Sequence, residues 1–233
     1  MTVFPFEAVL FDCDGVLVDS EPITARMLSI MLGELGWSLT QDEALRTFVG
    51  KTVRDEAALI HARTGFTLTD EWLAQFRARR DEALAREVQA IPGAPQAVRA
   101  LHGMLNGRVA VASGADVPKI ELQLRKIGIH DCFAGRILSG QEQPRNKPAP
   151  DVYLAAATAL GVAPQRCAVV EDTVTGATAG VAAGATVFGY SPGGPGHSST
   201  QALLRVGVAQ VFHDMRELPA LLAQATATTA DAS

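Results

Sequence analysis

Short apolar runs that alternate with helical patterns are the feature that most constrains the fold of this chain. The runs occupy residues 8–11, 108–112, 136–138, 167–170 and 185–189, and a further run at 208–212 suits an edge strand. Runs this short and this apolar are typical of strands buried on both faces of a parallel sheet. Helical patterns lie between them at 95–105, 117–127, 151–160, 176–183 and 215–223. We therefore expect an α/β fold, a Rossmann-like parallel sheet with helices on both faces.

One long segment departs from this alternation. From about residue 21 to residue 88 only helical patterning occurs, with apolar residues such as Ile23, Met27 and Ile30 at spacings of three and four. This predicts an all-helical domain at 18–89 inserted into an α/β core made of 1–17 and 90–233, with a frayed tail at 225–233. The insertion starts beside the carboxyl end of the first strand, where open α/β sheets bind ligands. We expect it to cap that site; the alternative is a passive decoration.

Composition and charge narrow the classes of function. The 233 residues are 48% hydrophobic and 19% charged, with a formal net charge of -5, which favours neither nucleic acid nor a membrane surface as a partner. Three scattered cysteines without a CxxC pair favour a reducing compartment. The start lacks a basic, apolar leader pattern, and no run of 18 apolar residues occurs. The expectation is a cytoplasmic protein, most simply a monomer.

Two carboxylates follow the first strand directly. Asp12 and Asp14 lie two positions apart, so their charges repel unless a cation lies between them. Mg²⁺ prefers oxygen ligands of this kind. A carboxylate can also attack phosphorus as a nucleophile, while a second one gives and takes protons. Taken alone the pair is a weak signal, because an acidic turn or a helix cap accounts for most such pairs.

Polar residues at three later strand ends strengthen that signal. Ser113 and Gly114 follow the strand at 108–112 and suit phosphate oxygens at a helix start. Lys147 precedes the helix at 151–160, where its ammonium can neutralise a nucleophile and phosphoryl oxygens. Glu171 and Asp172 end the strand at 167–170 and can complete a metal site. Singly, each has an ordinary explanation: Ser113 can be a helix cap, Lys147 a solvated loop charge, and the two acids can pair with a helix dipole. Their joint occurrence at four strand ends predicts phosphoryl chemistry.

Together, these residues form four sequence motifs that resemble those of the haloacid dehalogenase superfamily. They are DCDGVLVD at 12–19, ASG at 112–114, KPAPDVY at 147–153 and VEDT at 170–173, and they span nearly the whole chain. The helical insertion resembles the small cap of the β-phosphoglucomutase and phosphoglycolate phosphatase branch. Within it, FDCDG, VDSE and FVGK most resemble sugar-phosphate (6-phosphogluconate-type) phosphatases.

The resemblance implies a role for each motif residue. Asp12 would be the nucleophile and Asp14 the general acid/base, while Ser113 and Lys147 would bind phosphate. Mg²⁺ would be held by Asp12, the backbone carbonyl of Asp14 and Asp172, with Glu171 as a ligand or as a support for the ligands. Gly114 departs from relatives that carry a side chain there, which widens the expected pocket.

Other positions discriminate among members of the superfamily. Dehalogenases lack the second aspartate, so Asp14 favours phosphoryl chemistry. β-Phosphoglucomutase-like enzymes carry a histidine near the position of Thr24, and its absence here favours hydrolysis over transfer. Lys51 and Arg54 in the cap are candidates for binding a carboxylate or second phosphate of the substrate, or are ordinary exposed charges. The histidines are expected at the surface, at no metal-ligand spacing: His61, His102, His130, His197 and His213.

The sequence thus predicts a Mg²⁺-dependent phosphatase of a small phosphorylated metabolite, a sugar phosphate or phosphorylated sugar acid. The reaction would pass through an aspartyl-phosphate on Asp12. Two alternatives remain open at this point. One is a hexose-phosphate mutase, and the other is a catalytically silent protein that binds a phosphorylated metabolite.

Overall fold

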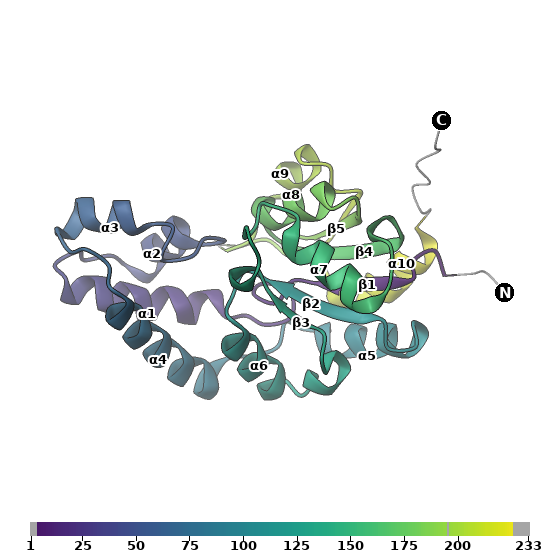
Figure 1. The fold of residues 1–233 in the computed structure, drawn as a ribbon, viewed down its shortest axis with the longest axis horizontal. Helices are drawn as coiled ribbons and strands as arrows, with labels where there is room; N and C mark the ends of the chain where they lie inside the picture. The colour runs from purple at the N-terminus through teal and green to yellow at the C-terminus, as the bar shows by residue number, and fades with distance from the viewer. Residues whose placement is uncertain (1–3, 195, 226–233) are drawn as a thin grey trace.

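A fully parallel sheet lies at the centre of the computed structural model, which describes residues 4–194 and 196–225 (Figure 1). The strand order of this six-stranded sheet is β3-β2-β1-β4-β5-β6. The strands are β1 (Ala8–Phe11), β2 (Val109–Ser113), β3 (Ile137–Ser139), β4 (Cys167–Glu171), β5 (Thr186–Tyr190) and β6 (Gln210–Phe212). The predicted parallel α/β sheet is confirmed, with the last strand at an edge.

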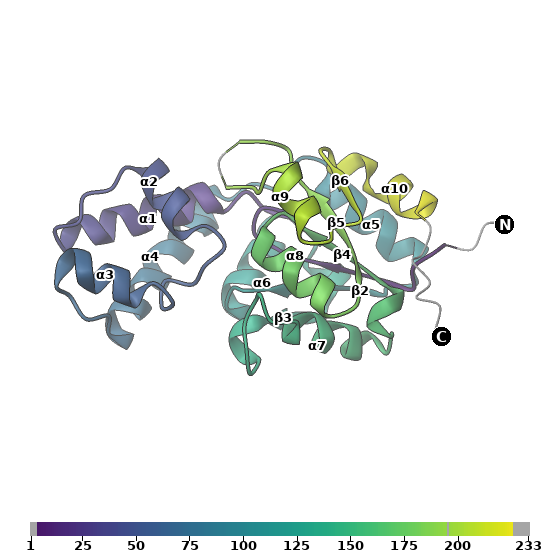
Figure 2. The ribbon, with the colours of Figure 1, turned by 90° about the horizontal axis from the view of Figure 1, so that it is seen from above.

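Side chains that alternate along β1 enter a separate apolar core on each face of the sheet. Val9 and Phe11 point to one face, and Ala8 and Leu10 point to the other. The first face is covered by α5 (Ala94–Met104), α6 (Val117–Lys126) and α10 (Leu218–Gln224). The second is covered by α7 (Asp151–Leu160), α8 (Val174–Ala182) and α9 (Thr200–Arg205) (Figure 2). Burial on both faces explains why these strands are apolar throughout.

Four helices lie between β1 and α5 and form a unit beside the sheet (Figures 1 and 2). They are α1 (Glu21–Glu34), α2 (Gln41–Phe48), α3 (Ala57–Thr64) and α4 (Asp70–Glu87), here called the cap. The cap has its own apolar cluster, which includes Leu28, Phe48, Ile60 and Trp72. The side chain of Thr69 accepts the backbone N–H of Trp72 at 3.2 Å and so caps the start of α4. The expected helical insertion is thus present.

The two chain segments that join cap and core run side by side. Val18 forms an antiparallel bridge with Ala90, and the backbone N–H of Asp19 donates to the carbonyl of Gln89 at 3.0 Å. Domain boundaries at 17/18 and 89/90 remain a prediction, although this pairing lies where they were expected. The predicted tail lies outside the described residues except for Ala225.

Shorter 3₁₀ turns complete the fold at His130–Phe133, Gly140–Glu142, Pro164–Arg166 and Met215–Glu217. The last of these replaces the first turn of the helix expected at 215–223. In the described part of the chain, no helix is both long and apolar enough to cross a membrane.

Candidate active site

A cavity of about 430 Å³ lies between the cap and the carboxyl ends of β1, β2 and β4. Its core wall contains six of the residues expected from the sequence: Asp12, Asp14, Ser113, Gly114, Lys147 and Glu171. Its cap wall includes Thr24, Leu28 and Phe48, together with Lys51 and Arg54. A ligand site at the carboxyl ends of a parallel sheet is the usual position in open α/β folds. The insertion therefore covers the strand ends that carry the motifs.

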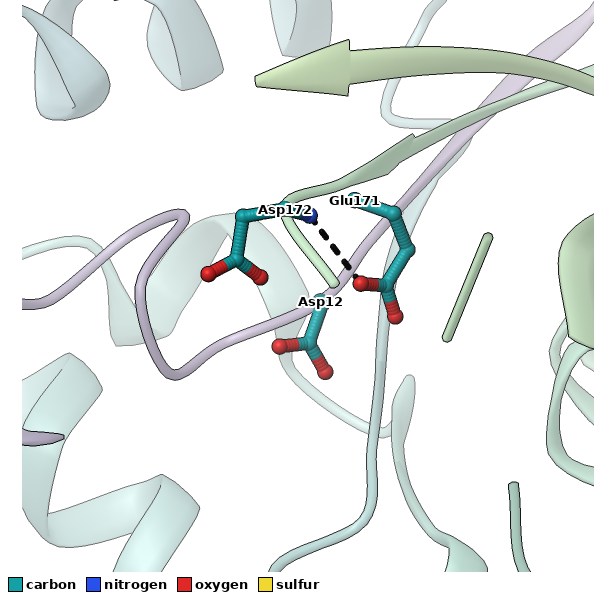
Figure 3. A group of neighbouring side chains, drawn as sticks. All are labelled: Asp12, Glu171 and Asp172. Carbon is teal, nitrogen blue, oxygen red and sulfur yellow. Dashed lines mark hydrogen bonds between the residues drawn. The ribbon is translucent and has the colours of Figure 1, made fainter. Parts of the chain in front are cut away.

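Three buried carboxylates lie close together (Figure 3); Asp12 and Glu171 line the cavity, whereas the predicted ligand Asp172 lies behind them and does not line it. Asp12 follows β1, whereas Glu171 ends β4 and Asp172 follows it. One carboxylate oxygen of each lies within 4.8 Å of the others, and the residues are 7%, 1% and 1% exposed, respectively. Burial raises the pKa of Asp12 to about 7, with Glu171 and Asp14 adding to that rise and Lys147 opposing it. Burial, followed by the charges of Glu171 and Asp12, also raises the pKa of Asp172.

Lys147 links two of these carboxylates. Its Nζ lies 2.7 Å from Asp12 Oδ1 and 2.7 Å from Glu171 Oε1. The hydroxyl of Tyr153, in the first turn of α7, lies 3.0 Å from the same Nζ and donates to Glu171 Oε1 at 2.7 Å. Although burial alone would lower it, the charges of Asp12 and Glu171 raise the pKa of Lys147. The ammonium is therefore fixed in its charged form beside Asp12.

Glu171 uses both of its oxygens within the protein. Oε1 accepts from Lys147 and Tyr153, and Oε2 accepts the backbone N–H groups of Asp172 at 3.0 Å and Thr173 at 3.3 Å. A Cβ on Gly176 would overlap this carboxylate, so glycine is required there for Glu171 to pack onto the start of α8. These contacts favour Glu171 as a support for neighbouring groups rather than as a direct ligand.

The donor set fits a divalent cation. Three carboxylates and the one ammonium of Lys147 leave an excess of two negative charges if all are ionised. Asp172 Oδ1 is buried and has no hydrogen-bond partner, which is costly unless a cation or a proton satisfies it. Oxygen ligands of this kind suit a hard cation. The cluster can therefore hold a metal ion, chiefly through Asp12 and Asp172.

The carboxylate of Asp14 lies outside this cluster and has other partners. Lys119 Nζ lies 2.8 Å from both of its carboxylate oxygens, and Gln123 Nε2 donates to Oδ1 at 2.9 Å. The hydroxyl of Ser20 donates to the same oxygen. Although burial alone would raise it, Lys119 and these hydrogen bonds lower the pKa of Asp14 to about 2. The side chain of Asp14 is not a member of the carboxylate cluster. Metal binding through its backbone carbonyl remains a prediction.

Ser113 and Gly114 form the turn after β2. Ser113 Oγ accepts the backbone N–H of Ala115 at 3.1 Å, so its own proton is available to an acceptor in the cavity. The carbonyl of Gly114 accepts from Gln141 Nε2 at 3.1 Å and from Asn146 Nδ2 at 3.4 Å. Both residues thus lie at the cavity, as expected from the sequence, in a turn that Gln141 and Asn146 hold.

Lys51 and Arg54 line the cavity from the cap. Lys51 Nζ lies 3.0 Å from Glu56 Oε1, and Arg54 pairs with Asp70 at 2.5 Å. Their side chains are 48% and 63% exposed. The structure brings both residues to the cavity but provides each with an acidic partner in the cap, so their contact with substrate remains a prediction.

His197 contradicts the expectation that every histidine lies at the surface. Its Nε2 lies 3.1 Å from the carbonyl oxygen of Gly15 and 3.8 Å from Asp172 Oδ2, and its side chain is only 14% exposed. The cause is that the loop after β5 packs onto the strand ends, where the backbone N–H of Ser198 donates to the carbonyl of Asp172 at 3.0 Å. Because 182 residues separate His197 from Gly15, no local pattern could reveal this contact.

Sequence reasoning also gave no role to Lys119, Gln123 or Tyr153. Lys119 and Gln123 are four positions apart on α6, so they share a face, and both are buried. Two polar residues at that spacing beside the apolar Ile120 and Leu124 were the available signal. Tyr153 lay inside the KPAPDVY segment, but its contact with Glu171 depends on how α7 packs against β4.

Comparison with known proteins places this site in a family. The model of the haloacid dehalogenase-like hydrolases matches residues 6–184. The chain belongs to that family. The matched residues include the ends of β1, β2 and β4 as well as the whole cap, so the resemblance predicted from the four motifs is confirmed.

Several relatives are similar over most of the chain. The 6-phosphogluconate phosphatase of Escherichia coli K12 is 33% identical over 183 residues, which cover 78% of this chain and 81% of that protein. Hexitol phosphatase B of the same organism is 31% identical, over 76% of this chain and 79% of that one. A crystal structure of a HAD family hydrolase from Deinococcus radiodurans R1, with bound phosphate and sodium, is 38% identical. It has a TM-score of 0.75, covering 95% of this chain and 96% of that one.

Proposed function

We propose that this chain is a Mg²⁺-dependent phosphoric monoester hydrolase that acts on a small phosphorylated metabolite, a sugar phosphate or phosphorylated sugar acid. The observation that carries the proposal is the contact of Lys147 with Asp12 and Glu171 at the core side of the capped cavity. It provides a carboxylate nucleophile, a fixed cation and a cation-binding cluster at one point.

The relatives support the enzyme class and the kind of substrate. Two of them are named as phosphatases of 6-phosphogluconate and of hexitol phosphates, and the Deinococcus structure holds phosphate. All three match this chain at more than 30% identity over most of its length. The family as a whole is that of haloacid dehalogenase-like hydrolases, so hydrolysis agrees with the family description.

In the first proposed step, a carboxylate oxygen of Asp12 attacks phosphorus and the bond from phosphorus to the leaving oxygen breaks. The electron pair of that bond goes to the leaving oxygen, which takes a proton from the protonated form of Asp14. Lys147 and the Ser113 hydroxyl bind phosphoryl oxygens, whose negative charge they neutralise. The product is an aspartyl-phosphate on Asp12 and a free alcohol.

In the second step, water attacks the phosphorus of the aspartyl-phosphate while Asp14 accepts its proton. The bond from phosphorus to the Asp12 oxygen breaks, which regenerates the carboxylate and releases inorganic phosphate. The cap limits access of bulk water to the cavity during both steps.

Mg²⁺ would be held by Asp12, Asp172 and the backbone carbonyl of Asp14, with Glu171 supporting them. When bound, it supplies positive charge against the phosphate and the crowded carboxylates. The buried, unpartnered Oδ1 of Asp172 supports this assignment. On the cap side, Lys51 and Arg54 would bind a second anionic group of the substrate.

A screen of phosphorylated metabolites for phosphate release in the presence of Mg²⁺ tests the proposal. We expect turnover that EDTA removes, and we expect Asp12→Asn to lower it at least about 10³-fold, as loss of a nucleophile does elsewhere. Asp131→Asn is the matched control, because Asp131 is an exposed aspartate in the 3₁₀ turn after α6.

Three results would contradict the proposal. Full activity in Asp12→Asn would exclude this residue as the nucleophile. Isomerisation of a sugar phosphate without net phosphate release would indicate a mutase. Binding of a phosphorylated metabolite without any turnover would indicate a catalytically silent protein.

A further inference from the structure

The loop between β5 and α9 packs against the segment that follows β4. The backbone N–H of Ser198 donates to the carbonyl of Asp172 at 3.0 Å, and Ser198 Oγ accepts the backbone N–H of Val174 at 3.0 Å. The loop is also closed on itself, because Ser191 Oγ donates to the carbonyl of Ser198 at 2.9 Å. No described residue of this loop lines the cavity. The loop is therefore attached to the Asp172 segment from outside the cavity.

His197, the residue before Ser198, contacts the segment that follows β1 instead. Its Nε2 lies 3.1 Å from the carbonyl oxygen of Gly15. Because a carbonyl oxygen can only accept, Nε2 carries the proton of this hydrogen bond. The ring also packs edge-on against Tyr190, with 5.8 Å between the ring centroids. His197 and Ser198 together thus join the two turns that follow β1 and β4.

Packing alone does not explain an imidazole at this position. Nδ1 of His197 is buried and has no hydrogen-bond partner in the described part of the chain. A buried polar atom of this kind costs free energy that an apolar ring of similar size would avoid. The contact with Tyr190 requires only a ring. The N–H donor at Nε2 is therefore the property that distinguishes histidine from phenylalanine at this position.

The contact of His197 holds the turn and leaves the neighbouring carboxylate free. Nε2 lies 3.8 Å from Asp172 Oδ2, which is too far for a hydrogen bond. The turn at Gly15 is packed closely against the same carboxylate, since a Cβ added to Gly15 would overlap Asp172 Oδ2. A shift of this turn would therefore change the space that the Asp172 carboxylate occupies.

We propose that His197 is a positioning residue for the Mg²⁺ site, which holds the turn of Asp14 and Gly15 against the turn of Asp172 at the spacing that a shared cation needs. The inference rests on the proposed function, from which it takes the bound cation. His197 acts through the carbonyl of Gly15 and need not touch the cation or the substrate.

Calorimetric titration of the substrate-free protein with Mg²⁺ at pH 8 tests this role. Loss of a group that supports metal ligands weakens metal binding about 10–100-fold, so we expect His197→Phe to raise the Kd for Mg²⁺ at least about tenfold. This variant keeps the ring beside Tyr190 and removes only the donor. His197→Gln keeps an N–H donor near the position of Nε2 and should recover most of the affinity.

His61→Phe is the matched control, because His61 is exposed on α3 of the cap. Its Kd for Mg²⁺ should equal that of the wild-type protein. Thermal unfolding in EDTA shows whether each metal-free variant is folded, which separates loss of the site from loss of the fold. If His197→Phe does not fold, His197→Leu provides the same comparison, since it also lacks the donor and has less bulk.

Three outcomes would overturn the inference. One is a Kd for Mg²⁺ in His197→Phe equal to that of the wild-type protein. Another is an equal loss of affinity in His197→Phe and His197→Gln, which would show that the donor is irrelevant. The third is lower thermal stability without any change in Kd, which would indicate a purely structural role.

The wild-type protein separates these outcomes from failure of the proposed function. If it binds no Mg²⁺, or releases phosphate equally well in EDTA, the Mg²⁺-dependent function is refuted and the inference with it. If it binds Mg²⁺ and releases phosphate only with Mg²⁺, an unchanged Kd in His197→Phe refutes the inference alone.

Discussion

At the scale of single residues, the site separates two groups of opposite charges. Lys147 faces Asp12 and Glu171, whereas Lys119 faces Asp14. The two aspartates of the DCD segment therefore have different surroundings, and the pKa of Asp12 is raised to about 7 while that of Asp14 is lowered to about 2. In the substrate-free site Lys119 thus holds Asp14 ionised, so Asp14 must take up a proton when substrate binds before it can act as the proposed general acid.

Gly15 has little freedom to change. Its φ is +77°, and an added Cβ would overlap Asp172 Oδ2 and lie 2.9 Å from Asp172 Cγ. Gly15→Ala should therefore displace Asp172, with a loss of about 1–3 kcal/mol in the free energy of unfolding. It should also weaken Mg²⁺ binding. Urea denaturation and calorimetric Mg²⁺ titration measure the two effects.

Gly36→Ala is the matched control for that change. Gly36 has a φ of +89° and nothing within 4 Å of an added Cβ, so it shares the backbone strain but not the collision. We expect Gly36→Ala to lower the free energy of unfolding by about 1 kcal/mol and to leave Mg²⁺ affinity unchanged. Equal Mg²⁺ affinities in the two variants would show that Asp172 has no part in metal binding.

At the scale of elements, the contact of α4 with α6 joins the cap to the core. Arg80 donates to Asp116 at 3.0 Å and to Asp81 at 2.8 Å, and its guanidinium lies 5.8 Å from the centroid of the Phe76 ring. Its side chain is only 8% exposed. A buried ion pair of this kind fixes the relative placement of two elements better than an exposed one.

Arg80→Met should therefore loosen the cap. Because the variant leaves Asp116 partly buried with a weaker partner, we expect a loss of about 2–4 kcal/mol in unfolding free energy. Hydrogen exchange should become faster in α4 and at the start of α6. Arg79→Met is the matched control, as the exposed pair of Arg79 with Glu34 lies within the cap and is worth less than about 0.5 kcal/mol. Similar losses in both variants would contradict a special role for the buried pair.

At the scale of the whole molecule, metal binding and folding are linked through protons. In the metal-free protein the pKa of Asp12 is about 7 when folded, against 3.8 as its ordinary value. A raised carboxylate pKa means that folding favours the protonated form, so this residue's contribution to stability declines as pH rises from about 4 to about 7. A bound cation has the opposite effect on this contribution, because it favours the ionised form of Asp12.

Mg²⁺ affinity should accordingly rise with pH. The cation displaces a proton from Asp12 below pH 7, so we expect binding to be about tenfold weaker at pH 6 than at pH 8, and proton release to accompany binding at pH 6. Calorimetry in two buffers of different ionisation enthalpy measures both quantities. Asp131→Asn should behave as wild type, and equal affinity at the two pH values would contradict the prediction.

Much of the fold could be predicted from the sequence because its determinants are local. Apolar runs of strand length, helical spacing and a long strand-free stretch gave the α/β class and the helical insertion. The motifs gave the family, since each follows a strand, and in a parallel sheet the carboxyl ends of all strands meet at one edge. That is why Asp12, Lys147 and Glu171, although far apart in the chain, were expected together and lie together.

Only the tertiary structure decided which side chains from other elements contact the residues at this edge of the sheet. The contacts of Lys119 with Asp14 and of His197 with Gly15 span 105 and 182 residues. Each contact depends on how a helix or loop packs onto the strand ends. The periodicity of a sequence predicts which face of a helix is buried, but it does not predict which residues that face contacts. The sequence by itself therefore determined the strand-end groups, whereas packing determined their partners: Asp14 pairs with Lys119, and Asp12 remains with Lys147 and the metal cluster.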